Sequence, residues 1–221
     1  MIFITFFFLG KKAMQRVREN SEGQMLPLVE EFYSIQGEGC NTGKAAYFIR
    51  VGGCDICCSW CDTRYSWNAE LHPMIAIEAI TANVIASGAD SVVVTGGEPL
   101  MWNLGPLCNL LKEKGIKTYL ETSGAYSLTG TWDWITLSPK KGSPPTAELW
   151  VKADELKVIV YDGTDFEAAE TYCSMVSPHC RLLLQPEWSR YGEMIAAITE
   201  YVKKNTKWMV SLQAHKFMHI P

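Results

Sequence analysis

Short apolar runs alternate with amphipathic segments along most of this chain. Seven runs have the length and the β-branched or aromatic character of strands, and several are apolar throughout, which suits strands buried on both faces. The seven runs are residues 47–51, 91–95, 117–121, 134–137, 156–161, 181–185 and 208–213. Such runs predict a mainly parallel sheet.

Segments with helical periodicity lie between these runs. Apolar residues share one helical face in residues 77–84 and 107–111, and Gly88 and Gly115 follow as plausible helix ends. Residues 166–175 and 191–204 predict two further helices. The alternation predicts right-handed strand-helix-strand units, hence an α/β fold. Because the chain is too short to close eight such units comfortably, a partial, incomplete TIM-like barrel is expected.

The composition fits one globular domain. The chain has 221 residues, 48% hydrophobic and 20% charged, which is ample for one core. We expect that domain to span residues 25–221, preceded by an N-terminal extension, residues 1–24, that is disordered or lies upstream of the true start. Met14 and Met25 are alternative starts.

The same composition limits the partners and the compartment. A net charge of -4 disfavours a broad nucleic-acid-binding surface, so a small-molecule substrate is favoured. The apolar run at residues 1–9 is too short to span a bilayer, and its lysines follow the run, whereas a signal peptide carries them before it. A cytoplasmic protein without a membrane partner is therefore expected.

The segment Cys54-Asp55-Ile56-Cys57-Cys58-Ser59-Trp60-Cys61 carries the strongest chemical signal. Cys54, Cys58 and Cys61 have the C-x3-C-x2-C spacing that suits a 4Fe-4S cluster with one iron left open. The mirrored spacing through Cys57 stays possible on arithmetic alone. Two abutting C-x2-C pairs also permit a zinc site, but structural zinc pairs are usually separated by a dozen or more residues. Unliganded thiols are the remaining alternative.

Polar and glycine-rich segments follow four of the predicted strands. They are residues 95–99 (TGGEP), 121–124 (ETSG), 138–140 (SPK) and 185–186 (QP). Because parallel strands end at one edge of the sheet, these segments are expected to meet there. Gly96 and Gly97 would let the backbone approach a ligand closely, although a plain turn is the commoner role. Glu98 is a possible acceptor for an amino group.

The cysteine segment, with Trp60 before its last cysteine, resembles the signature of the radical S-adenosylmethionine superfamily. Further segments narrow the resemblance to the 7-carboxy-7-deazaguanine synthase family, over nearly all of residues 25–221. They are residues 34–39 (SIQGEG), 48–50 (FIR), 58–63 (CSWCDT) and 213–216 (QAHK), together with the four strand-end segments above.

The resemblance implies a carbon-nitrogen lyase that converts 6-carboxy-5,6,7,8-tetrahydropterin to 7-carboxy-7-deazaguanine and releases ammonia, on the route to queuosine. It implies a 4Fe-4S cluster, S-adenosylmethionine and Mg²⁺ as cofactors. Removing a hydrogen atom from a reduced pterin carbon is a step that proteins delegate to a cofactor. A homodimer and a flavodoxin- or ferredoxin-type reductant are the further partners implied.

The resemblance also implies roles for individual residues, with no protein side chain performing the radical step itself. The metal ligands would be Cys54, Cys58 and Cys61 for the cluster and Thr63 for magnesium. The residues expected to contact S-adenosylmethionine are Trp60, Gly97, Ser123, Ser138, Pro139, Lys140 and Gln185. Those expected to contact substrate are Ile35, Gln36, Gly37, Arg50, Thr95 and the terminal Pro221.

Several of these residues also have ordinary structural explanations. Thr63 could cap a turn, Arg50 could be solvated, and His215 and Lys216 could belong to a solvated tail. Two other protein classes remain as alternatives: an activase of glycyl-radical enzymes, which lacks the segments at residues 36–39 and 62–63, and a non-catalytic iron-sulfur electron carrier. A carrier would be expected to have four cluster cysteines in a smaller fold.

Overall fold

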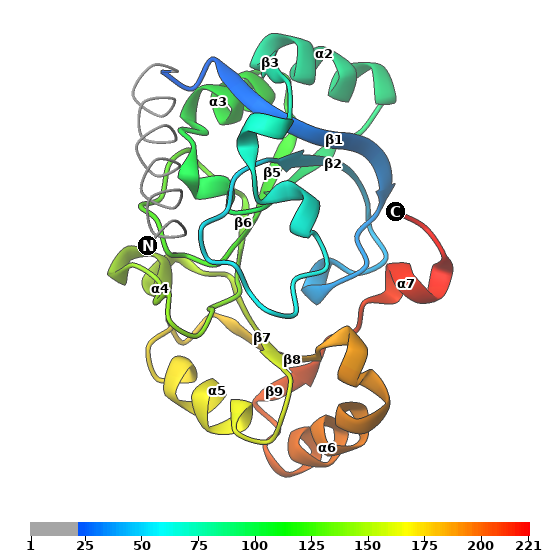
Figure 1. Ribbon diagram of the computed structural model, residues 1–221, viewed down its shortest axis with the longest axis vertical. Helices are drawn as coiled ribbons and strands as arrows, with labels where there is room; N and C mark the ends of the chain where they lie inside the picture. Colours follow the sequence, from blue (N-terminus) through cyan, green and yellow to red (C-terminus); the bar gives the residue numbers. More distant parts are fainter. Residues whose placement is uncertain (1–21) are drawn as a thin grey trace, which may run out of the picture.

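The computed structural model describes residues 22–221, so most of the extension predicted for residues 1–24 lies outside the described residues. In the described part, one nine-stranded sheet has the strand order β3-β1-β2-β4-β5-β6-β7-β8-β9 (Figure 1). From β2 to β9 every neighbouring pair is parallel, whereas β1 is antiparallel to both β2 and β3. The series has two ends, β3 and β9, so the expected partial barrel is confirmed.

The strands are β1 (Met25–Ile35), β2 (Ala45–Val51), β3 (Met74–Ala76), β4 (Ser91–Gly96), β5 (Lys117–Thr122), β6 (Trp134–Leu137), β7 (Glu155–Val160), β8 (Arg181–Pro186) and β9 (Trp208–Val210). The α-helices are α2 (Ile77–Ser87), α3 (Gly105–Glu113), α4 (Ala147–Lys152), α5 (Asp165–Cys173), α6 (Tyr191–Lys204) and α7 (Ala214–Met218). All seven predicted strands and all four predicted helices are present, and no end is shifted by more than three residues.

The largest shift is at β9, which ends at Val210, three residues before the end of the predicted run at residues 208–213. The next residue, Ser211, is still bound to β8: its amide donates to the Leu184 carbonyl at 2.9 Å, and its hydroxyl donates to Gln185 Oε1 at 2.7 Å. Predicted helix ends at Gly88 and Gly115 are confirmed by left-handed φ values of 75° and 72°, a conformation that glycine adopts without a steric penalty.

The core lies between the sheet and the helices outside it. Fully buried side chains from α2 and α3, such as Ile80 and Leu107, pack with strand residues such as Val94 and Leu120. The four longer helices lie around the periphery of the sheet (Figure 1). This leaves the inner face of the curved sheet free for other contacts.

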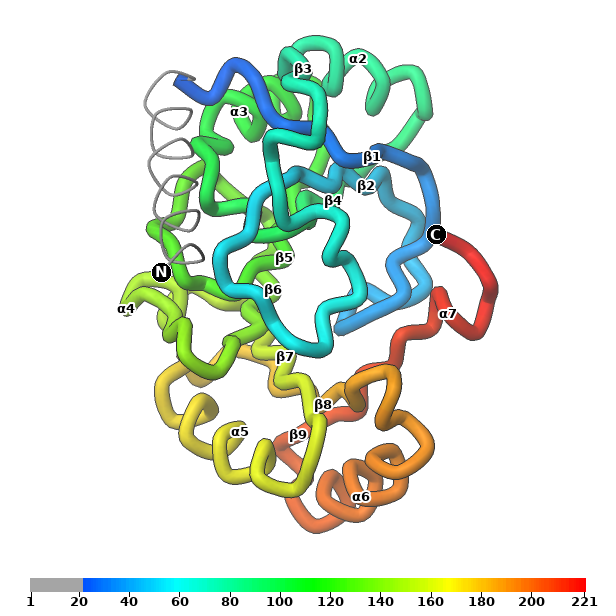
Figure 2. The backbone as a smooth tube through the Cα atoms, viewed as in Figure 1, coloured from blue at the N-terminus to red at the C-terminus, as the bar shows by residue number. Residues whose placement is uncertain are grey.

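The segment that follows β2 crosses this inner face. Figure 2 shows it, in cyan, running across the middle of the molecule between the β1 side and the β7–β8 side. The red C-terminal segment comes back beside β1, where the Ser34 hydroxyl donates to the Pro221 carbonyl at 3.3 Å. The C-terminal end of the chain therefore lies beside the carboxyl end of β1.

Among residues 22–221, no helix combines the length and apolar character needed to cross a bilayer.

Candidate active site

A pocket opens on the inner face, at the carboxyl ends of the parallel strands. Side chains alternate across a strand, so Phe48 and Arg50 of β2, Val93 and Thr95 of β4, and Glu121 of β5 all face the pocket. Every residue expected to bind a cofactor, a metal or the substrate lines this pocket, with the exception of Pro139. The structure therefore brings together residues that lie up to 186 positions apart in the chain, from Ile35 to Pro221.

The cysteine loop is one wall of the pocket. Cys54, Cys58 and Cys61 line it, whereas Cys57 does not and is exposed. Cys57 has a φ of 53°, so this residue adopts the left-handed conformation. The loop is tied down behind the cysteines, where the Cys54 amide donates to the Trp67 carbonyl at 3.0 Å. The indole of Trp67 in turn donates to Cys61 Sγ at 3.3 Å.

The chemistry of these thiols fits an iron-sulfur cluster. Burial raises the pKa of Cys54 to about 11 and also raises the pKa of Cys58, so neither side chain is stable as a bare thiolate. A bound cation would compensate for this cost. Within residues 22–221 no three His, Cys, Asp or Glu side chains converge on a point that would hold a single metal ion. A cubane does not require such convergence, because each cysteine binds a different iron.

The glycines after β4 are needed for strand packing. A Cβ atom on Gly96 would lie 2.1 Å from the Val51 carbonyl oxygen, and one on Gly97 would lie 2.3 Å from that of Gly53. The backbone is held there by a hydrogen bond of 3.0 Å from the Gly97 amide to the Val51 carbonyl. Both glycines also line the pocket, so close packing against β2 and exposure to a ligand occur at the same place.

Glu98 does not serve as a ligand acceptor in this arrangement. Its side chain is 1% exposed and does not line the pocket. One carboxylate oxygen accepts from the Leu100 amide at 3.0 Å and the Thr122 hydroxyl at 2.6 Å, and the other accepts from the amide and hydroxyl of Ser123. The predicted acceptor role for Glu98 is therefore wrong; it ties the end of β5 to the loop after β4.

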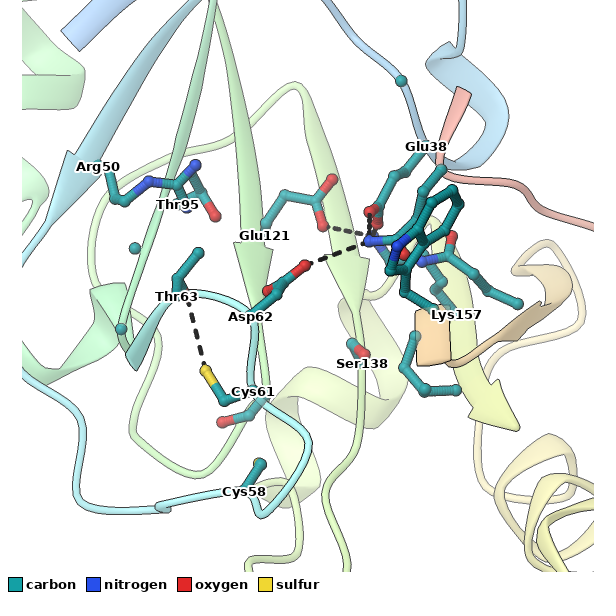
Figure 3. Close-up of a pocket in the computed structure, with 18 of the residues that line it drawn as sticks. Glu38, Arg50, Cys58, Cys61, Asp62, Thr63, Thr95, Glu121, Ser138 and Lys157 are labelled. Atoms are coloured by element: carbon teal, nitrogen blue, oxygen red, sulfur yellow. Dashed lines mark hydrogen bonds and ion pairs between the residues drawn. The ribbon is translucent and has the colours of Figure 1, made fainter. Parts of the chain in front are cut away.

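A buried charged cluster that the sequence analysis did not identify forms the floor of the pocket. Lys157 Nζ on β7 contacts Glu38 Oε2 at 2.6 Å and Glu121 Oε2 at 2.8 Å (Figure 3). Burial opposes the charge of Glu38, but Lys157 and two amide side chains more than offset it and lower the pKa of Glu38 to about 2. For Glu121, burial and the neighbouring carboxylates prevail and raise the pKa.

The C-terminal segment closes another side of the pocket. The Ala214 amide donates to the Gly37 carbonyl at 2.8 Å, and the His215 ring packs so closely that a Cβ on Gly37 would lie 2.4 Å from its Nδ1. Burial lowers the pKa of His215, which favours its neutral form. His215 and Pro221 both line the pocket, and Lys216 is held by Asp62 at 3.1 Å. These residues are packed against the site, so the alternative of a solvated tail is wrong.

Several of these unpredicted residues had signals in the sequence. Lys157 interrupts an apolar strand, and a lysine in such a position is seldom buried without a partner. Glu38 and Glu121 lie inside segments already singled out, next to residues that were assigned roles. Gln213 begins the segment 213–216, which was also singled out, but only the fold brings its Nε2 to 2.9 Å from Glu38 Oε1.

Comparisons with known proteins agree on one family. A family model described as a 4Fe-4S single cluster domain matches residues 35–171. A 7-carboxy-7-deazaguanine synthase from Flavobacterium psychrophilum is 52% identical over 200 residues, which cover 90% of this chain and 95% of that protein. The chain belongs to the 7-carboxy-7-deazaguanine synthase family. A synthase of that name from Synechocystis is 44% identical, over 88% of this chain and 93% of the relative.

The 7-carboxy-7-deazaguanine synthase family also includes a solved structure with this fold. The crystal structure of QueE from Escherichia coli matches with a TM-score of 0.79 and 28% identity, covering 91% of this chain and 98% of that chain. Membership in the synthase family makes this chain an iron-sulfur, radical S-adenosylmethionine enzyme of deazapurine chemistry. Family membership also favours an iron-sulfur cluster over a zinc site at the cysteine segment, and it favours an enzyme over a non-catalytic electron carrier.

Proposed function

We propose that this enzyme converts 6-carboxy-5,6,7,8-tetrahydropterin to 7-carboxy-7-deazaguanine and releases ammonia. The observation that carries the proposal is the single pocket in which Cys54, Cys58 and Cys61 face Arg50 and Thr95. When bound, the cluster and S-adenosylmethionine supply a 5'-deoxyadenosyl radical that abstracts the substrate's C6 hydrogen atom. The protein residues bind the substrate, orient it and exclude water.

The S-adenosylmethionine site would lie beside the cysteine loop. Trp60, Gly97, Ser123, Ser138, Lys140 and Gln185 line that part of the pocket. Lys140 Nζ donates to Ser138 Oγ at 2.6 Å and lies 5.2 Å from the Trp60 ring centroid. Burial lowers the pKa of Lys140. Pro139 lies outside the lining, although its neighbours Ser138 and Lys140 belong to it, so its contact with the cofactor stays a prediction.

The substrate would lie toward β1, β2 and the C-terminal segment. Ile35, Gln36, Gly37, Thr95 and Pro221 line this side, together with Arg50. An arginine presents a planar fork of donors that matches a carboxylate, so Arg50 is suited to hold the 6-carboxylate. Gln36 Nε2 donates to Glu121 Oε1 at 3.1 Å, and both side chains line the pocket, which supports a role in binding polar groups of the pterin ring.

Thr63 is the proposed magnesium ligand. Thr63 precedes a short 3-10 helix (Arg64–Ser66) without a capping hydrogen bond from its side chain. Among the described residues, its hydroxyl contacts one polar partner, Cys61 Sγ at 3.6 Å. The hydroxyl is thus available to a hard cation that keeps water and substrate oxygens as its other ligands.

The proposal is tested by anaerobic reconstitution with iron and sulfide, followed by incubation with S-adenosylmethionine, a reductant and the carboxypterin. Formation of 7-carboxy-7-deazaguanine and ammonia in equal amounts is expected. Cleavage of S-adenosylmethionine without that product would contradict the assigned substrate. Hydrogen abstraction from a protein partner would instead support the activase alternative, and no cleavage at all would support an electron carrier.

A further inference from the structure

Arg50 is held at one specific nitrogen by a residue outside the pocket. Its Nε donates to Glu30 Oε1 at 2.6 Å, and neither terminal nitrogen of Arg50 donates a hydrogen bond to another of the described residues. Arg50 lines the pocket and Glu30 does not. The ion pair therefore binds the side of the guanidinium and leaves its far end, with both terminal nitrogens, facing the pocket beside Thr95 (Figure 3).

Glu30 is itself fixed from two directions. It lies directly across from Arg50 in the antiparallel pairing of β1 with β2, next to an irregularity in the register between Leu28 and Glu30. The same oxygen that binds Arg50 also accepts the Tyr65 hydroxyl at 3.0 Å. Tyr65 belongs to the segment that follows the cysteine loop, so this contact connects β1, β2 and that segment.

A carboxylate can bind a guanidinium either at its side, through Nε and one terminal nitrogen, or at its end, through both terminal nitrogens. With Nε occupied, only the end remains for a bidentate contact. We propose that Glu30 is a positioning residue that presents the end of the Arg50 guanidinium to the substrate's carboxylate. This inference rests on the proposed function, because it assumes a carboxylated ligand in the pocket.

Charge and exposure are consistent with that role. The Glu30 side chain is 40% exposed and that of Arg50 is 17% exposed, so water screens the glutamate more than the arginine. The negative charge of Glu30 thus opposes a second carboxylate only weakly, while its hydrogen bond still fixes the plane of the guanidinium. An ordinary surface ion pair of this exposure would contribute little to stability.

Binding to the reconstituted protein, with cluster and S-adenosylmethionine, tests the proposal by calorimetry with two probes. The probes are 7-carboxy-7-deazaguanine and 7-deazaguanine, which lacks the carboxylate. We expect Glu30→Ala to weaken the carboxylated probe by about three- to tenfold, the scale of one misplaced charged hydrogen bond. The uncarboxylated probe should bind as it does to the unaltered protein. Glu30→Gln keeps an acceptor for Nε and should lose less.

Glu31→Ala is the matched control, because it removes the neighbouring carboxylate on the same strand. Glu31 accepts from Asn83 and does not line the pocket, so both probes should bind normally. Equal weakening of both probes in Glu30→Ala would indicate general damage and overturn the positioning role. Unchanged binding of the carboxylated probe would overturn it as well.

Kinetics separate this inference from the proposed function. In an Arg50→Lys background, Glu30→Ala should cause no further loss in kcat/KM, since the group it positions is gone. Additive losses would contradict the inference. If the unaltered enzyme turns over the carboxypterin and Glu30→Ala matches it, only the Glu30 role fails. If the unaltered enzyme makes no product, the proposed function fails first.

Discussion

Cys57 shows how a single backbone angle selects among adjacent thiols. Its φ of 53° is uncommon for a residue with a side chain. Cys58, the residue after this turn, lines the pocket, whereas Cys57 is exposed and lies outside the lining. Sequence arithmetic allowed either thiol to join Cys54 and Cys61, and the structure favours Cys58.

Iron content measured on single alanine variants tests this cluster register. Cys54→Ala, Cys58→Ala and Cys61→Ala should each lose most of the iron after anaerobic reconstitution, because three thiolates are already the minimum for the proposed site. Cys57→Ala is the built-in control and should keep its iron and its visible absorption. The register is wrong if Cys57→Ala loses iron while Cys58→Ala retains it.

The role of Arg50 in turnover is expected to depend on the shape of its side chain as well as on its charge. Arg50→Lys keeps the charge but loses the fork, so kcat/KM for the carboxypterin should fall about ten- to a hundredfold, the scale of one lost charged hydrogen bond of about 1.5 to 3 kcal/mol. Iron content measured in parallel should not change. Near-normal kcat/KM with a full cluster would rule out the anchoring role.

Thr63 is expected to control the response to magnesium. Thr63→Ala removes the hydroxyl and should reduce the increase in turnover as Mg²⁺ is added. This cation binds few protein ligands, so the loss of one should weaken its binding. Thr63→Ser keeps the hydroxyl and should retain the response. A Thr63→Ala enzyme that responds to magnesium like the unaltered enzyme would exclude this ligand.

At the scale of elements, Lys157 joins parts of the chain that no local sequence connects. It lies in the middle of β7, and its ion pairs reach Glu38, just before the 3-10 helix Gly39–Asn41, and Glu121 on β5. Its side chain is 4% exposed. The two carboxylates raise the pKa of Lys157 even though burial opposes its charge, so the lysine stays charged inside the sheet.

Lys157→Met should destabilise the fold by about 3 to 5 kcal/mol, because it leaves two buried carboxylates without their cation. Thermal or urea unfolding of the reduced apoprotein measures this. Lys203→Met, which breaks an exposed pair with Glu200, is the matched control and should change stability by less than about 1 kcal/mol. If Lys157→Met loses no more stability than the control, the ion pairs of Lys157 do not hold β5, β7 and the segment before the 3-10 helix together.

The difference in unfolding free energy between the unaltered protein and Lys157→Met should also depend on pH. The folded-state pKa of Glu38 is about 2, below its ordinary 4.5, so its stabilising contribution is present above pH 4.5 and is lost as the pH falls toward 2. Because the pKa of Glu121 is raised, its contribution to the stability of the unaltered protein changes with pH in the opposite direction. Without Lys157 both carboxyls protonate more readily, so the gap between the unaltered protein and Lys157→Met should narrow from pH 6 to pH 3. A constant gap would contradict this assignment.

For the whole molecule, the features that were predicted correctly are those that a short stretch of sequence encodes. The parallel strands and the longer helices were predicted because continuous apolar runs and helical periodicity are local signals. β1 was missed because it mixes polar and apolar residues, as in Glu30, Glu31 and Phe32, and lies antiparallel on one side of the barrel. β3, α4 and α7 are three to six residues long, too short for a periodic pattern.

Sequence motifs predicted part of the site, and the fold adds residues that no motif contains. Of the residues expected to bind a cofactor, a metal or the substrate, all but Pro139 line the pocket, and the expectation for most of them came from the family resemblance. Glu98 was misassigned because three of the four donors that satisfy its carboxylate come from Thr122 and Ser123 at the end of β5, which only the fold brings near. The Lys157 cluster and the Glu30–Arg50 pair depend on contacts 20 to 119 residues apart, which no local pattern encodes.

The two ends of the sheet bear on how this protein behaves at high concentration. Both edge strands, β3 and β9, are only three residues long. Beyond Pro27, β1 has no strand on its outer side among the described residues, but it carries Glu30 and Glu31 there, and charges on an exposed edge disfavour pairing with the strand of another molecule. The apolar interior strands, such as β4 with its three consecutive valines, are the segments prone to fibrous association. They are enclosed between neighbours, so aggregation is expected to begin from opened or partly unfolded chains and to be governed by the rate at which the sheet opens.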